Sequence, residues 1–138
     1  MSNSDQLKRL QRRMEAIPRA VREAVQPALK VSADEMAASM ASLAPVDSGA
    51  LKDSIAVTPA GQTTPAYSQP GGSKIVPENS VAITVGNTDV RYPHLVEYGT
   101  KVTSPQPFFW PAFRLLRKRA ERRIKRAITK AVRDGWSK

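Results

Sequence analysis

The side chains that could carry acid–base or metal chemistry are few in this sequence. Its 138 residues include one histidine, His94, and no cysteine. The absence of cysteine excludes disulfides, thiolate nucleophiles and cysteine-ligated metal sites. His94 would need a nucleophile beside it to act as a general base, and neither a nucleophile elbow nor another triad motif surrounds it. We therefore expect an ordinary histidine, exposed or half-buried at the start of a strand.

The carboxylates and glycines show no catalytic spacing either. Asp47, Asp89 and Glu97 form neither a D-x-D nor an E-x-x-H pattern, and helix capping and ion pairing would account for them. The pair Gly71-Gly72 has no predicted strand before it and no predicted helix after it, unlike a phosphate-binding loop. The sequence therefore predicts no enzyme activity, no metal site and no cofactor.

Positive charge is the strongest signal in the composition, and it is concentrated at the C-terminal end. The net charge is +10, and by segment it is +2 for residues 1–40, −1 for residues 41–107 and +9 for residues 108–138. A nearly neutral body with a cationic end predicts an anionic partner, or an acidic neighbour in an assembly. The residues that we single out as facing either DNA or a protein interface are Arg114, Arg117, Lys118, Arg122 and Arg126.

The cationic stretch at 114–133 has two open interpretations. It could follow duplex DNA, where each phosphate contact adds salt-dependent, sequence-independent affinity. Alternatively, it is a solvated face, or it packs on an acidic surface of another subunit. The stretch contains no aromatic residue, which argues against base stacking on single strands. We expect no membrane partner, because its bulky apolar residues are too few for firm insertion and no apolar run in the chain could span a bilayer.

A cluster of aromatic and proline residues precedes this stretch, in the sequence P-Q-P-F-F-W-P-A-F at 105–113. Such a cluster can plug the core, or it can anchor a subunit interface, where tryptophan and phenylalanine contribute much of the binding energy. Three adjacent aromatic side chains cannot all point inward from one helical turn, so we expect some of each. Phe109 and Trp110 therefore join the candidate interface or DNA-facing residues.

Apolar residues recur with helical spacing at both ends of the chain. In the first segment, a stripe that starts at Leu7 keeps a period of 3.6 residues over ten steps. Pro18 and Pro27 should kink this helix or divide it into coaxial pieces, since each removes a backbone donor, and Pro45 should end it. Residues 108–138 repeat the helical spacing, with arginine and lysine on the remaining surface.

Between the helices the pattern changes to that of short strands. Residues 54–58 and 81–86 alternate with a period of two, and the simplest arrangement pairs them antiparallel. Residues 59–79, with four prolines and three glycines, predict a long, mobile loop. Residues 94–100 could add a third strand or a short helix. The predicted fold is α+β, with one domain over residues 1–138 divided into an N-terminal helical arm (1–44), a small antiparallel sheet with its loop (45–107) and a basic C-terminal helix (108–138).

Four motifs follow one another along the chain: A-P-V-D-S-G-A-L-K-D-S-I at 44–55, V-G-N-T at 85–88, Y-P-H-L-V-E-Y-G-T at 92–100 and P-Q-P-F-F-W-P-A-F at 105–113. In this order they resemble the tail-completion or head–tail joining (neck) proteins of long-tailed bacteriophages, the group that includes the lambda-type tail-completion protein Z. Each motif alone is weak, and the order and spacing make the resemblance specific. The positions that carry it are Pro45, Asp47, Gly49, Leu51, Ile55, Gly86, Glu97, Gly99, Thr100, Pro107, Phe108 and Pro111.

The resemblance implies a virion protein of the neck or tail without catalytic activity. Such a protein completes the tail and joins it to the DNA-filled head as part of a homo-oligomeric ring, a hexamer or a dodecamer. The implied partners are further copies of the chain, neighbouring neck proteins and tail-tube or tail-terminator proteins, with non-specific contact to phage DNA. Assembly would take place in the cytoplasm of the host bacterium.

The shared positions also have physical interpretations. Gly49 and Gly99 suit turns that need a positive φ. The residues that would fill the small core are Leu51, Ile55, Leu95 and Val96. Glu97 could accept hydrogen bonds from the backbone or an arginine, or pair with the basic helix of a neighbouring copy. The N-terminal helix is longer than its core, so another subunit should bury its apolar stripe, which favours a ring. Two alternatives from other classes are a small basic duplex-DNA-binding protein and an enzyme that uses His94.

Overall fold

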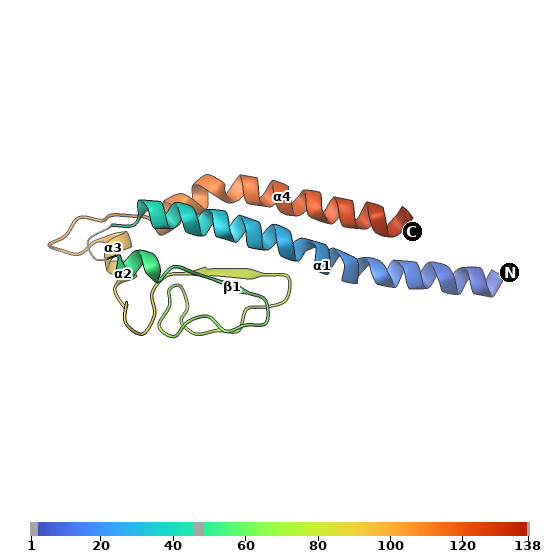
Figure 1. Ribbon diagram of the computed structural model, residues 1–138, viewed down its shortest axis with the longest axis horizontal. Coiled ribbons are helices and arrows are strands. Elements are labelled where there is room, and N and C mark those ends of the chain that lie inside the picture. The colour runs from blue at the N-terminus through green and yellow to red at the C-terminus, as the bar shows by residue number, and fades with distance from the viewer. Residues whose placement is uncertain (1–2, 46–48, 138) are drawn as a thin grey trace.

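The computed structural model of the chain describes residues 3–45 and 49–137 and has an α+β fold (Figure 1). Long helices lie at the two ends of the chain, with a small antiparallel sheet and two short helices between them. The predicted fold class is therefore confirmed. The elements in chain order are α1 (Asn3–Leu43), α2 (Ala50–Asp53), β1 (Ala56–Pro59), β2 (Val81–Thr84), α3 (Pro93–Tyr98) and α4 (Phe109–Ser137).

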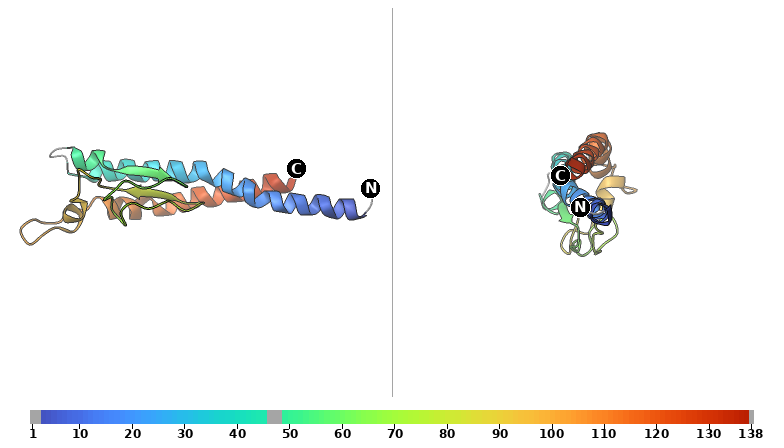
Figure 2. Two further views of the ribbon diagram at one scale, coloured as in Figure 1. Left: turned by 90° about the horizontal axis from the view of Figure 1, so that it is seen from below. Right: turned by 90° about the vertical axis from the view of Figure 1, so that its right-hand side faces the viewer.

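The two long helices run antiparallel, side by side along the length of the molecule (Figures 1 and 2). At 1.5 Å per residue, α1 is about 60 Å long and α4 about 43 Å. Gly135 near the end of α4 lies against Ile17 of α1, so closely that a Cβ at Gly135 would be 3.1 Å from Ile17 Cγ1. The first turns of α1 therefore extend beyond the end of α4, as Figure 2 shows.

Both internal prolines lie inside α1, which continues through them as one helix. Pro18 and Pro27 are exposed, so each interrupts the backbone hydrogen bonding on a side of the helix that water can reach. Of the two predicted outcomes, one kinked helix and separate coaxial pieces, the second is wrong because α1 is a single helix. The kink stays a prediction. The helix ends at Leu43, before Pro45, as the restricted backbone of a residue preceding proline predicts.

The core lies in the half of the helix pair that is farther from the N-terminus, where the sheet covers the helices (Figure 1). Of the buried positions of the predicted α1 stripe, Met36 and Met40 belong to the core cluster, together with the small residues Ala112 and Ala120 of α4. Small residues at these positions let the helix axes approach closely. The buried members of the cluster are Met36, Met40, Ala44, Leu51, Val85, Val90, Phe108, Phe109, Ala112 and Ala120.

The sheet has the predicted antiparallel pairing, within two residues of the predicted boundaries. β1 pairs with β2 in a register that sets Ala56 opposite Thr84 and Pro59 opposite Val81. The pairing ends at Pro59, which has no N–H to continue the ladder. Between described residues this is a two-stranded sheet, and such a sheet is marginal by itself. It depends on its packing against α1.

The long connection at 59–79 is a loop, as predicted, but it carries internal hydrogen bonds that the sequence did not indicate. Thr64 Oγ1 accepts a hydrogen bond from the Lys74 N–H at 2.8 Å and donates to the Gly72 carbonyl at 2.7 Å. Gln69 forms an isolated antiparallel bridge with Val85, just after β2. The loop thus folds back beside the sheet. Its mobility stays a prediction.

The segment at 94–100, which could have been a strand or a helix, contributes to the short helix α3. Residues three and four apart share a helical face, and here that face presents Pro93, Val96 and Glu97 to the core. The prediction that Leu95 fills the core is wrong, because Leu95 lies on the opposite face and is 45% exposed. Beyond α3, residues 100–107 project past the end of the helix pair (Figure 1).

Candidate functional site

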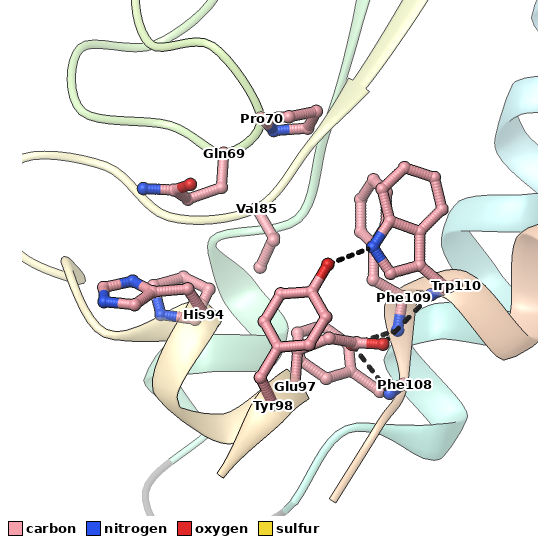
Figure 3. Close-up of a pocket in the computed structure, with 10 residues that line it drawn as sticks. Gln69, Pro70, Val85, His94, Glu97, Tyr98, Phe108, Phe109 and Trp110 are labelled. Carbon is pink, nitrogen blue, oxygen red and sulfur yellow. Dashed lines mark hydrogen bonds between the residues drawn. The ribbon is translucent and has the colours of Figure 1, made fainter. Parts of the chain in front are cut away.

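Glu97 of α3 caps the N-terminus of α4. Its Oε1 accepts hydrogen bonds from the N–H groups of Phe108 at 3.0 Å and Phe109 at 2.9 Å, and its Oε2 accepts one from Trp110 at 3.3 Å (Figure 3). The next residue, Pro111, has no N–H, so every backbone donor that the start of a helix leaves unpaired is accounted for. The carboxylate is 7% exposed and also complements the positive end of the helix dipole. Of the predicted roles of Glu97, the structure shows backbone acceptance.

Two glycines allow the chain to approach itself closely around this cap. Gly99 follows α3 with a φ of 77°, and a Cβ there would lie 2.8 Å from the Pro105 nitrogen and 2.9 Å from the Thr103 carbonyl oxygen. Gly86 follows β2 with a φ of 96°, and a Cβ there would lie 2.8 Å from the Val90 carbonyl oxygen. Only glycine tolerates such geometry. The positive φ predicted for Gly99 is confirmed.

The aromatic cluster divides between the core and a shallow cavity. Phe108 is completely buried and Phe109 is nearly so, whereas Trp110 is half-buried. The Trp110 Nε1–H donates to the Tyr98 hydroxyl at 2.8 Å, and its ring packs edge-on against Phe109. The prediction that Phe109 faces an interface or DNA is wrong, because its side chain is buried in the chain's own core.

A cavity of about 70 Å³ opens beside Trp110 (Figure 3). It is bounded by α3, the start of α4 and the loop residues Gln69 and Pro70, and its lining is mostly apolar. His94 lies at its rim and is exposed. Among the described residues, the imidazole has no hydroxyl or carboxylate within hydrogen-bond distance.

The remaining motif positions take structural places around the cap and the core. Gly49 precedes α2 with the predicted positive φ, 73°, and Leu51 on α2 is buried. Asp47 lies outside the described residues. In the projecting segment, residues 100–107, the Thr100 Oγ1 accepts hydrogen bonds from two backbone N–H groups. The motif residues that remain are the half-buried Pro45, Ile55 and Pro111 and the exposed Pro107.

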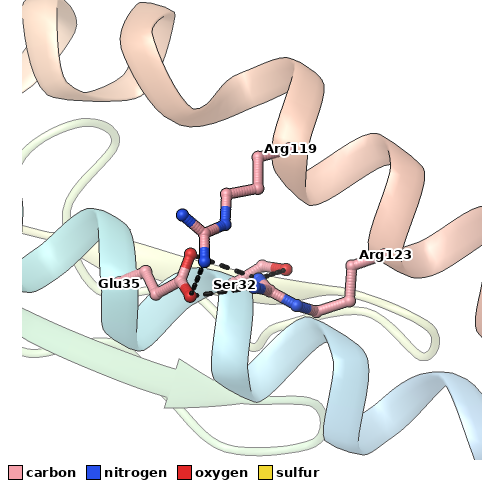
Figure 4. A network of polar contacts seen from close by, with 4 residues as sticks. All are labelled: Ser32, Glu35, Arg119 and Arg123. Carbon is pink, nitrogen blue, oxygen red and sulfur yellow. Dashed lines mark hydrogen bonds and ion pairs between the residues drawn. The ribbon is translucent and has the colours of Figure 1, made fainter.

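An ion-pair network joins the two long helices (Figure 4). Arg123 of α4 contacts both carboxylate oxygens of Glu35 on α1, at 2.8 and 3.3 Å, and donates to Ser32 Oγ at 3.0 Å. Arg119 approaches the same carboxylate at 3.5 Å. Arg123 is 23% exposed, so this contact is shielded better than an ordinary surface pair. The network explains Ser32, the polar position in the apolar stripe of α1.

The cations predicted to face DNA or an interface form an exposed face of α4, which we call the basic face: Arg114, Arg117, Lys118, Arg122 and Arg126. Arg117 pairs with Glu121 at 3.0 Å. The other four follow one another at intervals of four residues, and no carboxylate lies within ion-pair distance of them in the described part of the chain. Buried Ala112, Ala120 and Ala131 occupy the side of α4 that packs on α1.

The N-terminal turns of α1 carry an apolar surface that no other element covers, which we call the N-terminal stripe. Leu7 is 56% exposed and Leu10 is 40% exposed, although both continue the face that is buried farther along the helix. The side chain of Met14, the next position of the stripe, lies outside the described part of the structure. The cause of the exposure is the difference in helix length, since α4 ends beside Ile17.

Several residues of these arrangements were missed in the sequence. Arg119 and Arg123 belong to the same basic stretch as the predicted cations, but Glu35 is 88 residues from Arg123, and nothing local marks the pair. Ser54, whose Oγ accepts the Gly86 N–H at 3.0 Å, is 32 residues from its partner and is not marked locally either. A signal did exist for Glu97: no Ser, Thr, Asp or Asn stands where α4 begins, so its cap had to come from elsewhere.

Two classes of site are not found among residues 3–45 and 49–137. These residues include no group of three or more histidine, aspartate or glutamate side chains placed to hold a metal ion. Within the same residues, no helix combines the length and the apolar character that crossing a bilayer requires. The features that remain are surfaces: the basic face, the N-terminal stripe and the projecting segment.

Comparison with known proteins adds a family. No curated protein matches the chain, and no solved structure does. Residues 8–99 match the HK97-gp10-like family model, described as "Bacteriophage HK97-gp10, putative tail-component". The match covers two thirds of the chain, from within the N-terminal stripe through α3, and it contains Glu97 but neither Leu7 nor α4. The chain therefore belongs to the HK97-gp10-like family of bacteriophage tail components.

Proposed function

We propose that this tail component completes the phage tail and joins it to the DNA-filled head, as one copy of a homo-oligomeric ring in the neck. Its group would be that of the lambda-type tail-completion protein Z. The family supports a structural role in the tail, and the order of the four motifs supports the finer assignment. The partners would be further copies of the chain and the proteins of the adjoining neck and tail rings.

The observation that carries this proposal is the N-terminal stripe. Burying an apolar side chain stabilises a protein by about 25 cal/mol per Å² of surface removed from water. Leu7 and Leu10, 56% and 40% exposed, forgo about half of this in the isolated chain. The exposed leucines continue the same helical period as the buried residues of α1, so the apolar face extends beyond the part of the helix that the core covers. Another protein surface would complete it, and in a ring the neighbouring copy provides that surface.

The mechanism of such a protein is geometric. A ring commits a finished tail to a filled head when its interfaces match the rings above and below it. The elongated shape (Figure 2), with Leu7 exposed near one end and Val102 near the other, suits a copy that spans from one ring to the next. No acid, base or metal is needed for this role.

Complementation of a phage that lacks this chain tests the proposal. The double substitution Leu7→Glu with Leu10→Glu should leave complete heads and complete tails that fail to join, counted by electron microscopy. The matched control is Lys8→Gln with Arg12→Gln, which changes the charge by the same two units on the same exposed turns. The control should yield joined virions.

Two results would overturn the proposal. If the Leu7 and Leu10 variant joins heads to tails normally, the stripe has no role in assembly. If loss of the chain gives absent or shortened tails in place of complete, unjoined ones, its role lies elsewhere in the tail. The alternative function, a small basic DNA-binding protein, would be supported by normal joining together with defects in packaged or replicating DNA.

A further inference from the structure

Four of the five cations of the basic face of α4 form no ion pair within the described residues. Arg123 and Arg119 are directed to Glu35, and Arg117 to Glu121. Arg114, Lys118, Arg122 and Arg126 remain exposed and have no carboxylate partner within the described residues. Neighbouring cations repel one another. Arg122 and Arg126 donate to backbone carbonyls of their own helix, but no negatively charged group offsets the repulsion. A partner that supplies negative charge would remove this repulsion.

The composition of the face indicates which kind of partner that is. The central contacts of protein interfaces are rich in aromatic side chains and poor in lysine. Between Phe113 and Trp136, α4 has no aromatic residue, and the one large apolar side chain exposed among the four cations is Leu115. A surface of arginine and lysine with a single exposed apolar side chain and no aromatic anchor is typical of phosphate contacts, which position a protein without reading sequence.

The spacing of the cations also suits a duplex. Arg114 and Arg126 are separated by about 18 Å along the helix at 1.5 Å per residue. Duplex DNA presents one negative charge per about 1.7 Å of its axis, so about ten phosphates lie within that length. Packing against α1 and the pair between Arg123 and Glu35 hold the helix as a rigid support. We propose that the basic face binds the phosphate backbone of duplex DNA without regard to sequence.

This site does not depend on the proposed function, because it can be tested on the purified full-length chain. The probe is a 30-base-pair duplex in two unrelated sequences, and binding is measured by fluorescence anisotropy from 50 to 300 mM salt. Wild type should bind both duplexes equally. In the variant with Arg114, Lys118, Arg122 and Arg126 all changed to Gln, the slope of log Kobs against log salt should flatten by about 3 to 4, since each phosphate contact contributes about 0.9.

Two further variants separate the face from net charge and from misfolding. Changing Lys8, Arg12, Lys52 and Lys101 to Gln removes the same four charges from exposed positions on other elements, and should leave the slope within about one unit of wild type. Changing Arg114, Arg122 and Arg126 to Lys keeps every charge and should keep the slope, because a phosphate contact needs charge more than guanidinium geometry.

The affinity gives a second readout. At 0.1 M salt the four-glutamine variant of the basic face should lose at least about a hundredfold in affinity. The inference is wrong if that variant binds duplex as tightly as wild type, even if it fails to join tails, because the face would then dock on a protein. It is equally wrong if the control with four charges removed elsewhere weakens binding as much, because net charge alone would then explain it.

Discussion

Glu97 shows how one side chain can determine where a helix begins. It reaches from α3 to three consecutive backbone N–H groups at the start of α4, a task that a residue beside the helix usually performs. The carboxylate thereby links the short middle segment to the second long helix. Because the carboxylate is buried and both of its oxygens already accept backbone hydrogen bonds, it is unavailable to a neighbouring copy.

Replacing Glu97 should therefore destabilise the whole fold. Glu97→Ala leaves three buried donors without an acceptor and should lower the free energy of unfolding by about 3 kcal/mol. Glu97→Gln should cost less, since its amide oxygen can still accept from Phe108 and Phe109. Urea denaturation measures both. The control, Glu121→Ala, removes an exposed pair with Arg117 and should cost less than about 1 kcal/mol; an equal loss in Glu97→Ala and the control would contradict the capping role.

Gly99 permits a comparison between backbone strain and steric overlap. Gly99 and Gly61 both have positive φ, 77° and 83°, but a Cβ at Gly61 would meet nothing within 4 Å. Gly61→Ala should cost about 1 kcal/mol from the backbone alone. Gly99→Ala adds contacts below 3.0 Å with backbone atoms and should cost at least about 2 kcal/mol more. The two midpoints of urea unfolding give the difference, and equal midpoints would show that the turn relaxes.

At the scale of elements, the sequence predicted what depends on local periodicity. Both long helices follow from apolar residues spaced by three or four, and the pairing of β1 with β2 follows from alternation. The choice between strand and helix at α3 could not be made, since six residues do not distinguish a period of 2 from one of 3.6. Leu95 was misplaced for the same reason: without knowing the helix, its face could not be assigned.

The contacts between elements were beyond sequence reasoning for a different reason. The pair of Glu35 with Arg123 joins residues 88 positions apart, and the basic stretch offered many arginines as partners. Which cations the fold uses and which it leaves exposed depends on how α4 is rotated against α1. The sequence therefore singled out the cations of the basic face, but it could not identify Arg119 and Arg123 as the two arginines that the fold directs to Glu35.

The pair between α1 and α4 should be stronger than the surface pairs of the same chain. A double-mutant cycle of Glu35→Gln and Arg123→Gln should give a coupling free energy of about 1 to 2 kcal/mol, because the pair is partly shielded and bidentate. The exposed pair of Lys30 with Asp34 should give less than about 0.5 kcal/mol in the same urea experiment. Similar coupling free energies in the two cycles would mean that shielding and bidentate geometry do not strengthen the pair of Glu35 with Arg123.

At the scale of the whole molecule, stability and assembly should depend on different parts of the chain. Residues 4–12 are exposed along their whole length, so they contribute little to the folded state of one copy. The core lies at the other end of the helix pair. A surface that is dispensable for folding but apolar is best explained by a use in contact with other molecules.

Removing each end of the helix pair tests this separation. Deletion of residues 1–12 should change the free energy of unfolding by less than about 1 kcal/mol and should abolish head–tail joining in the complementation assay. Deletion of residues 131–138 removes buried Ala131 and its packing, and should destabilise the chain by at least about 1 kcal/mol. Strong destabilisation by the first deletion would show that the N-terminal turns belong to the fold.

The projecting segment at 100–107 makes the two ends of the molecule unlike each other. One end is the bare start of α1, and the other is a turn held by Gly99 and Thr100 with Val102 almost fully exposed. A cyclic ring of parallel copies has no symmetry operation that exchanges its upper and lower faces. Any such ring of this chain would have polarity: stacked the wrong way up, it would offer each neighbour the wrong surface. An adaptor with this asymmetry can distinguish a head from a tail by orientation alone.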